Sequence, residues 1–235
     1  MRALILQHDP GSLAGLLGEA LEARTVTSHE LAMGLSVHDA TFTDDFPPLD
    51  GFDLVVPLGA VYTLYDDEQV GTWIDRELHL LRDADAAGIP VLGVCFGAQA
   101  LSAAHGGKVY RAGAPEVGYS TIETFDAARI PQGPWMQWHY DVCTVPDGAE
   151  LLAVSDAGPQ AFTLRRNLAL QFHPEVTVAM IDNWLDLDRE GAEASLQEAG
   201  TDVDTVRADA ADNAERQRAD IDAILDWWLP SVALT

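Results

Sequence analysis

Three short apolar runs stand out in the first half of the chain. Residues 3–6, 54–58 and 89–94 are apolar at almost every position. A half-buried strand alternates apolar and polar residues, whereas a parallel strand covered on both faces has an unbroken apolar run. The pattern therefore predicts three central strands of a parallel sheet.

Two helical patterns separate these runs. Leucines recur at helical spacing between residues 13 and 21, and the segment 67–88 carries one apolar face and ends at Gly88, a residue type favoured just after a helix. The apolar positions are Leu13, Leu16, Leu17 and Leu21, and then Val70, Trp73, Ile74, Leu78 and Leu81. Strands that alternate with helices predict an α/β fold in which helices flank a parallel central sheet.

The second half of the chain has shorter strand-like pieces, which predict antiparallel strands added to the sheet. These pieces are residues 108–111, 119–125, 142–145, 161–164 and 168–172. Cys143 lies inside one of them, so we expect it in the core rather than in a reactive position.

The last quarter of the chain predicts a helix, an acidic loop and a terminal helix. Apolar residues recur in the terminal helix every three to four positions, so we expect it to dock on the domain. These residues are Ile221, Leu225, Trp228 and Leu229. No repeat or linker divides the sequence, and we expect one domain over residues 1–235.

Charge and composition exclude several classes of function. The chain has 38 Asp and Glu residues against 13 Lys and Arg, a formal net charge of −25, which repels polyanions and excludes nucleic acid and anionic membranes as partners. No stretch reaches the roughly 18 apolar residues of a membrane helix, and the N-terminal apolar run is too short for a secretion signal. Two cysteines without metal-binding spacing favour a cytoplasmic protein that has no metal site.

The strongest chemical signal is the segment Gly93-Val94-Cys95-Phe96-Gly97, which follows an apolar strand and precedes a helical pattern. A strand, a tight turn and a helix with glycines two residues either side form a nucleophile elbow, because the turn tolerates little bulk. A thiol at a helix N-terminus is favoured as the thiolate, and the Phe96 N–H is free to bind an oxyanion. The alternative is a buried structural cysteine.

A thiol nucleophile needs a base, and the base needs a group that orients it. His173 follows the apolar run 168–172 and precedes Pro174 and Glu175. Proline stops the strand, so Glu175 can turn back towards the imidazole. We expect Cys95, His173 and Glu175 to meet as a triad; the alternative for His173 is a strand-end histidine bonded to backbone.

These segments resemble the class I (triad) glutamine amidotransferases. Residues 92–99 read L-G-V-C-F-G-A-Q, like the family's G-x-C-x-G-x-Q elbow, and residues 171–175 read Q-F-H-P-E, like its second signature. The likeness covers roughly residues 3–185 and includes an oxyanion loop at residues 58–61. The segments 116–119 and 137–141 are most similar to the glutaminase domain of GMP synthetase. The resemblance implies a flavodoxin-like fold, with a catalytic core of about 1–185 and an acidic helical extension of about 186–235.

The resemblance also implies a role for each matching residue. Cys95 is the expected nucleophile, His173 the base and Glu175 the residue that orients it. The residues implied in oxyanion and glutamine binding are Gly59, Ala60, Phe96, Gln99 and the loop residues Trp138, Tyr140 and Asp141. Ala60 replaces the family's usual second glycine, which puts the backbone conformation of the oxyanion loop in question. His139 is expected to shape the substrate pocket rather than to act as a second base.

The implied function is hydrolysis of glutamine to glutamate and ammonia without a cofactor. No synthetase domain or phosphate-binding loop follows in the sequence, so we expect a separate synthetase partner to accept the ammonia. Two alternatives stay open. The same triad can serve a γ-glutamyl peptide or amide hydrolase, and the fold can serve a non-catalytic regulatory subunit.

Overall fold

The computed structural model describes residues 1–34 and 36–232. Its strands are β1 (Arg2–Gln7), β2 (Thr27–Ala32), β3 (Leu54–Pro57), β4 (Leu92–Val94), β5 (Val109–Ser120), β6 (Glu123–Thr124), β7 (Trp135–Cys143), β8 (Glu150–Val154), β9 (Pro159–Leu164) and β10 (Asn167–Leu170). Its helices are α1 (Gly15–Ala23), α2 (Asp67–Val70), α3 (Ile74–Ala86), α4 (Phe96–Ala104), α5 (Val178–Leu187), α6 (Arg189–Glu198) and α7 (Val203–Val232).

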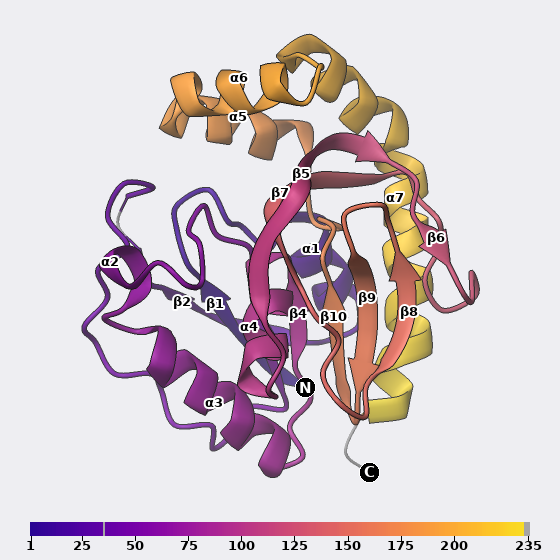
Figure 1. Ribbon diagram of the computed structural model, residues 1–235. Helices are drawn as coiled ribbons and strands as arrows, with labels where there is room; N and C mark the ends of the chain where they lie inside the picture. The colour runs from indigo at the N-terminus through magenta and orange to yellow at the C-terminus, as the bar shows by residue number, and fades with distance from the viewer. Residues whose placement is uncertain (35, 233–235) are drawn as a thin grey trace.

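The central sheet has the strand order β2-β1-β3-β4-β10-β9-β8-β6 (Figure 1). A parallel bridge between Val55 and Val91 joins its three-stranded and five-stranded parts. The first five strands in this order are parallel, and the last three alternate in direction. Strands β5 and β7 form a separate antiparallel pair. The expected α/β fold, with a parallel sheet and added antiparallel strands, is confirmed.

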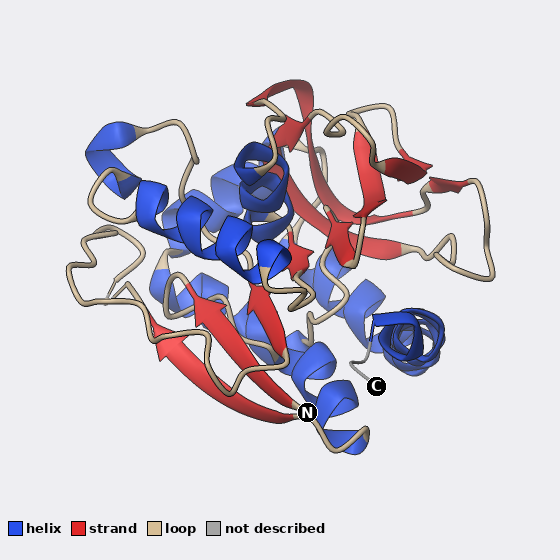
Figure 2. Ribbon diagram, turned by 90° about the horizontal axis from the view of Figure 1, so that it is seen from below, coloured by secondary structure: helices blue, strands red, loops and turns tan. Residues whose placement is uncertain are grey.

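Helices cover both faces of the sheet (Figure 2). Successive residues of β1 point to opposite sides: Ala3 and Ile5 pack towards α1 and α7, and Leu4 and Leu6 pack towards α3 and α4. This two-sided burial explains why the central strands are apolar at every position rather than at every second one. The terminal helix α7 docks as expected, with Ile221, Leu225, Trp228 and Leu229 buried.

The parallel strands bring chemically active residues to one edge of the sheet. Cys95 directly follows β4, and Gly59 and His173 lie two and three residues beyond the ends of β3 and β10. The carboxyl ends of parallel strands meet at the same edge, which is where open α/β sheets bind ligands. The fold therefore assembles one site from segments that are far apart in the sequence.

The prediction of a single helix over residues 67–88 was wrong. The segment forms α2 and α3, separated at Gly71–Trp73. Trp73 is buried and its indole N–H donates a 2.6 Å hydrogen bond to the carbonyl of Ala40, so this contact fixes the side chain at the break. Gly88 follows the end of α3 with φ 74°, as expected of a glycine at this position.

Several strand boundaries also differ from the expectation. The piece 108–111 lies at the start of β5, and the piece 119–125 is divided between the end of β5 and the short strand β6. The register of β5 shifts between Arg111 and Glu116. Residues 138–141 were expected in a loop, but they lie inside β7. Strand β2 was not predicted, because this edge strand is almost fully exposed and carries no apolar pattern.

The C-terminal quarter is more helical than expected. The predicted acidic loop is occupied by α6 and the first turns of α7. Asp188 begins α6 by accepting a hydrogen bond from the Gly191 N–H. Within residues 1–34 and 36–232, no helix is long and apolar enough to cross a membrane.

Candidate active site

Cys95 occupies a strained turn between β4 and α4. Its backbone angles, φ 51° and ψ −107°, are rare for a residue with a side chain. The turn requires its two glycines: a Cβ on Gly93 would lie 2.5 Å from the carbonyl oxygen of Gly97, and a Cβ on Gly97 would lie 2.0 Å from that of Pro57. The Gly97 N–H also donates to the carbonyl of Leu58 at 3.0 Å, which ties the elbow to the neighbouring loop.

His173 and Glu175 form a buried hydrogen-bonded pair. Nδ1 of His173 lies 2.7 Å from Oε1 of Glu175, and the His173 N–H donates to the carbonyl of Met136 at 2.8 Å. Burial lowers the pKa of His173, but Cys95 and Glu175 more than offset this effect, so its pKa lies well above the ordinary value. Nε2 has no hydrogen-bond partner among the described residues. The ring is thus anchored through Nδ1, and Nε2 is available for proton transfer.

Cys95 and His173 face the same cavity, which has a volume of about 370 Å³. Gly59 packs against both of them: a Cβ at this position would lie 3.1 Å from Cε1 of His173 and 3.8 Å from Cβ of Cys95. A side chain at residue 59 would press on the His173 ring, so glycine gives the loop room to approach. The structure brings the three residues of the expected triad together.

Two residues that line the cavity with Cys95 have free backbone N–H groups, namely Ala60 and Phe96. Phe96 is the first residue of α4, where N–H groups have no partner within the helix. Within the described part of the chain, neither the Phe96 N–H nor the Ala60 N–H donates a hydrogen bond. The non-glycine residues with positive φ in that part are Thr25, Cys95 and Arg165. Ala60 therefore has an ordinary backbone conformation, and alanine fits where the family usually has glycine.

Buried amide side chains extend from the thiol into the domain. Nε2 of Gln171 lies 3.7 Å from Sγ of Cys95, and Nε2 of Gln99 donates to Oε1 of Gln171 at 3.2 Å and to the carbonyl of Asp141 at 2.9 Å. Gln99 thus supports Gln171 and also lines the cavity. Gln171 donates towards the sulfur, which favours a negative charge there.

Trp138, Tyr140 and Asp141 line the cavity from strand β7 and not from a loop, and Trp138 and Asp141 pair with residues of β5. The Asp141 carboxylate accepts hydrogen bonds from the hydroxyls of Thr63 and Tyr65, both at 3.0 Å. His139 also lines the cavity, with Nε2 3.1 Å from the Glu116 carboxylate. The expectation that it shapes the pocket agrees with this position.

Residues of α5 and α6 also line the cavity, and no sequence pattern predicted them. Figure 1 shows these two helices lying beyond the ends of β5 and β7. They contribute Trp184, Leu187, Asp188, Gly191, Ala192 and Ser195. Arg111 was also missed, although it is the one Lys or Arg side chain among the lining residues; its guanidinium lies 4.2 Å from the ring centre of Tyr140. No local motif marks these positions, because only the packing of distant segments places them here.

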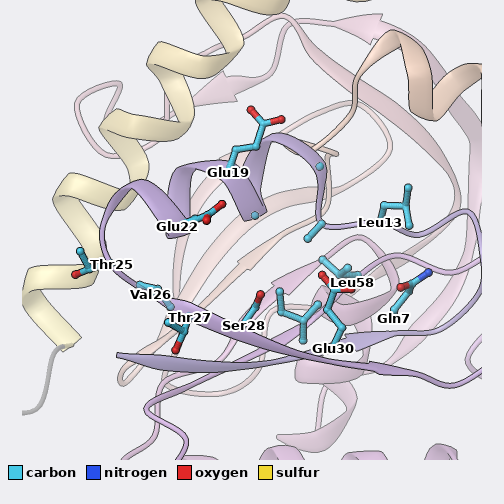
Figure 3. Close-up of a pocket in the computed structure, with 14 residues that line it drawn as sticks. Gln7, Leu13, Glu19, Glu22, Thr25, Val26, Thr27, Ser28, Glu30 and Leu58 are labelled. Atoms are coloured by element: carbon cyan, nitrogen blue, oxygen red, sulfur yellow. The ribbon is translucent and has the colours of Figure 1, made fainter.

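A larger cavity, of about 490 Å³, lies between α1 and β2 (Figure 3). Its lining has three glutamates but no cysteine, histidine, lysine or arginine: Glu19, Glu22 and Glu30. It therefore lacks the thiol and the imidazole that the expected chemistry needs. Within residues 1–34 and 36–232, no cluster of His, Cys, Asp and Glu is arranged to hold a metal ion.

Comparison with known proteins gives one family match. The family described as "Glutamine amidotransferase class-I" matches residues 35–185. GMP synthase [glutamine-hydrolyzing] from Aquifex aeolicus is 36% identical over 99 residues, which is 38% of this chain and 19% of that protein. The chain thus spans about a fifth of the length of the curated relatives it matches.

Two solved structures share the fold over almost the whole chain. A glutamine amido transferase from Methylobacillus flagellatus has a TM-score of 0.85 and 20% identity, covering 100% of this chain and 96% of its own. A glutamine amidotransferase from Thermotoga maritima has a TM-score of 0.82 and 22% identity, covering 97% and 98%. At these identities the likeness concerns the fold.

Proposed function

This chain belongs to the class I glutamine amidotransferase family, and we propose on that basis that it hydrolyses the side-chain amide of glutamine to glutamate and ammonia. One observation carries the proposal. The Cys95 thiol at a strained elbow shares a cavity with His173, which is held by Glu175 at 2.7 Å. A nucleophile, a base and an orienting carboxylate in this arrangement are suited to acyl transfer.

In the first half of the proposed reaction, His173 accepts the proton of Cys95, and the thiolate attacks the amide carbon of glutamine. The negative charge that develops on the amide oxygen is bound by the free N–H groups of Ala60 and Phe96. When the intermediate collapses, the C–N bond breaks, and His173 returns its proton to the leaving nitrogen. The products of this step are ammonia and a thioester on Cys95.

In the second half, His173 accepts a proton from water, and the hydroxide attacks the thioester carbon. The same N–H groups bind the oxyanion. The C–S bond then breaks, which releases glutamate and regenerates the thiol of Cys95. Glu175 keeps the His173 ring oriented and stabilises its protonated form in both halves.

The charged end of the substrate also finds partners in the cavity. We assign the α-carboxylate of glutamine to Arg111, because a guanidinium binds a carboxylate with two hydrogen bonds. We assign the α-ammonium group to Asp141, because it is an acidic residue that also lines the cavity. These two contacts place the side-chain amide towards Cys95.

The ammonia acceptor is proposed from the relatives. Their name, GMP synthase [glutamine-hydrolyzing], joins glutamine hydrolysis to synthesis of a nucleotide. This chain matches about a fifth of the length of those proteins. We propose that a separate synthetase subunit receives the ammonia.

The proposal is tested by glutamate release from glutamine and by labelling with a glutamine-analogue diazoketone. We expect Cys95→Ser to abolish both turnover and labelling. Cys143→Ser is the matched control, since Cys143 is the other cysteine and burial raises the pKa of its thiol to about 11. Full turnover in Cys95→Ser, or label on Cys143 instead of Cys95, would contradict the proposal.

A substrate comparison separates the glutaminase from a γ-glutamyl hydrolase. Both enzymes break the bond between the γ-carbonyl carbon and a nitrogen, so only the preferred substrate distinguishes them. The wild-type protein is assayed with free glutamine and with γ-glutamyl dipeptides. Each assay is run with and without candidate synthetase subunits. Higher kcat/KM for free glutamine, increased further by a synthetase, supports the proposed function. Turnover of the dipeptides alone rejects it.

A further inference from the structure

His8 lies directly behind the proposed oxyanion loop and has no part in the reaction described above. It is the first residue after β1 and is 1% exposed. Its ring stacks on Trp73 at 5.4 Å between centroids and contacts Phe96 at 4.9 Å. Within the described part of the chain, the ring nitrogens have two hydrogen-bond partners, the carbonyl of Gly59 and the carboxylate of Glu77.

Both ring nitrogens of His8 face groups that only accept hydrogen bonds. Nδ1 lies 3.0 Å from the carbonyl oxygen of Gly59, and Nε2 lies 3.1 and 3.2 Å from the two carboxylate oxygens of Glu77. A neutral imidazole has one N–H and would leave one acceptor unpaired. The geometry therefore indicates an imidazolium. Burial lowers the pKa of His8, but Glu77 and the Gly59 carbonyl raise it above the ordinary value.

The contact to Gly59 fixes the direction of the next N–H. The Gly59–Ala60 peptide is trans, so its C=O and N–H point in opposite directions. The carbonyl points to His8, while the Cα of Gly59 faces His173 and Cys95. The N–H of Ala60 therefore points away from His8. Ala60 lines the same cavity as Cys95, and His8 is not among the residues that line it.

A second contact holds the other side of Ala60. Oδ2 of Asp9 accepts a hydrogen bond from the Val61 N–H at 3.1 Å. Asp9 follows His8 in the chain and is itself fixed by the Gly11 N–H and the Ser12 hydroxyl. The two peptide bonds that flank Ala60 are thus both anchored to the segment after β1.

We propose that His8, supported by Glu77, is a positioning residue that holds the Gly59 carbonyl and thereby aims the Ala60 N–H at the oxyanion. The role rests on the proposed function, since it concerns the oxyanion of acyl transfer. A peptide free to flip would present a carbonyl oxygen to the negative charge. His8 thus makes the binding site for the oxyanion before the substrate arrives.

The test compares two variants of nearly equal shape that differ in one hydrogen-bond donor. Both variants also carry Glu77→Met, so that neither leaves the buried carboxylate of Glu77 unpaired. Replacement of a buried ion pair by apolar residues is commonly tolerated. His8→Asn keeps a donor near the position of Nδ1, whereas His8→Leu removes it. Loss of one oxyanion donor costs roughly 10²–10³-fold in kcat. We expect this loss in the Leu variant and less than about a tenfold loss in the Asn variant.

Two further readouts separate positioning from damage to the fold. The KM for glutamine and the rate of Cys95 alkylation by iodoacetamide should be the same in both variants, because alkylation at a saturated carbon forms no oxyanion. His79→Leu, an exposed histidine on the same helix as Glu77, serves as the control. Equal kcat in the Asn and Leu variants would overturn the inference.

Crystal structures of the two variants test the role of His8 without any activity measurement. We expect the Gly59 carbonyl to keep its direction in the Asn variant and to rotate away in the Leu variant. An unchanged peptide in the Leu variant would overturn the role of His8. Failure of the wild-type protein to hydrolyse glutamine would instead count against the proposed function. In that case the orientation of the Gly59–Ala60 peptide in the two variants would still test the role of His8.

Discussion

The buried carboxylate of Glu175 is one of two groups that raise the pKa of His173, and Cys95 is the other. Glu175 lies 2.7 Å from Nδ1 of the ring, and its charge raises the pKa of His173 together with Cys95, against the effect of burial. A raised pKa means that the imidazolium persists to a pH above 6.5, the ordinary value. Removal of the Glu175 charge should therefore lower the pKa.

Glu175→Gln should shift the pH profile of kcat/KM. The alkaline limb, where His173 loses its proton, should move to lower pH, and kcat should fall by about 10²–10⁴-fold because the ring loses its orientation and charge support. Steady-state kinetics from pH 5 to 10 measure both effects. Glu116→Gln is the matched control, since it removes a carboxylate from beside His139; a shift of the same limb in this variant would contradict the assignment to His173.

At the scale of elements, the terminal helix α7 supports the segment that carries Glu175. Gln217 of α7 is fully buried, and its Nε2 donates to the carbonyls of Pro174 at 2.8 Å and Val176 at 3.0 Å. Its Oε1 accepts from the hydroxyl of Tyr119 at 3.2 Å. The helix therefore holds the backbone on both sides of Glu175.

Gln217→Leu should destabilise the protein and lower its activity together. Two buried carbonyls would lose their donor, and an unsatisfied buried group costs about 1–3 kcal/mol. Urea unfolding measures the loss of stability, and kcat reports the displacement of Glu175. Gln197→Leu changes an exposed glutamine on α6 and should alter neither. Wild-type kcat in folded Gln217→Leu would show that α7 does not position the triad.

The sequence predicted the elements whose signals are local. The runs 3–6 and 54–58 and the elbow around Cys95 are fixed by buried apolar residues and by glycines beside a tight turn. Edge strand β2 and the break at Gly71–Trp73 were not predicted. Both depend on distant partners, since β2 is held by backbone pairing to β1 and Trp73 bonds to Ala40.

At the scale of the whole molecule, charge is the dominant feature. The chain carries a net charge of −25, and its arginines are largely used in surface ion pairs such as Arg24 with Asp222 and Arg129 with Glu150. Exposed pairs contribute little, about 0–1 kcal/mol each. The remaining acidic residues repel one another and oppose the compact state.

Added salt should therefore stabilise the protein. The Debye length falls from about 10 Å at 0.1 M to about 3 Å at 1 M, which screens repulsion more strongly than it weakens the few ion pairs. We expect the urea midpoint to rise with NaCl over this range. Sucrose, which stabilises without screening charge, is the control for general exclusion from the surface. A urea midpoint that does not rise with NaCl would show that repulsion between acidic residues contributes little to the free energy of unfolding.

The sequence by itself determined the parallel α/β architecture and the three residues proposed for chemistry, Cys95, His173 and Glu175. Their signals are short: an apolar strand, a glycine-flanked turn and a proline after a strand. Each of these acts within a few residues, so pattern and sterics are sufficient to read it.

The tertiary structure decided what surrounds those residues. It placed Gly59 against both Cys95 and His173, brought α5 and α6 over the cavity, and set His8 between the Gly59 carbonyl and Glu77. His8 is separated by 51 residues from Gly59 and by 69 from Glu77. Contacts at such separations arise from the packing of helices on a sheet, and no local pattern records them.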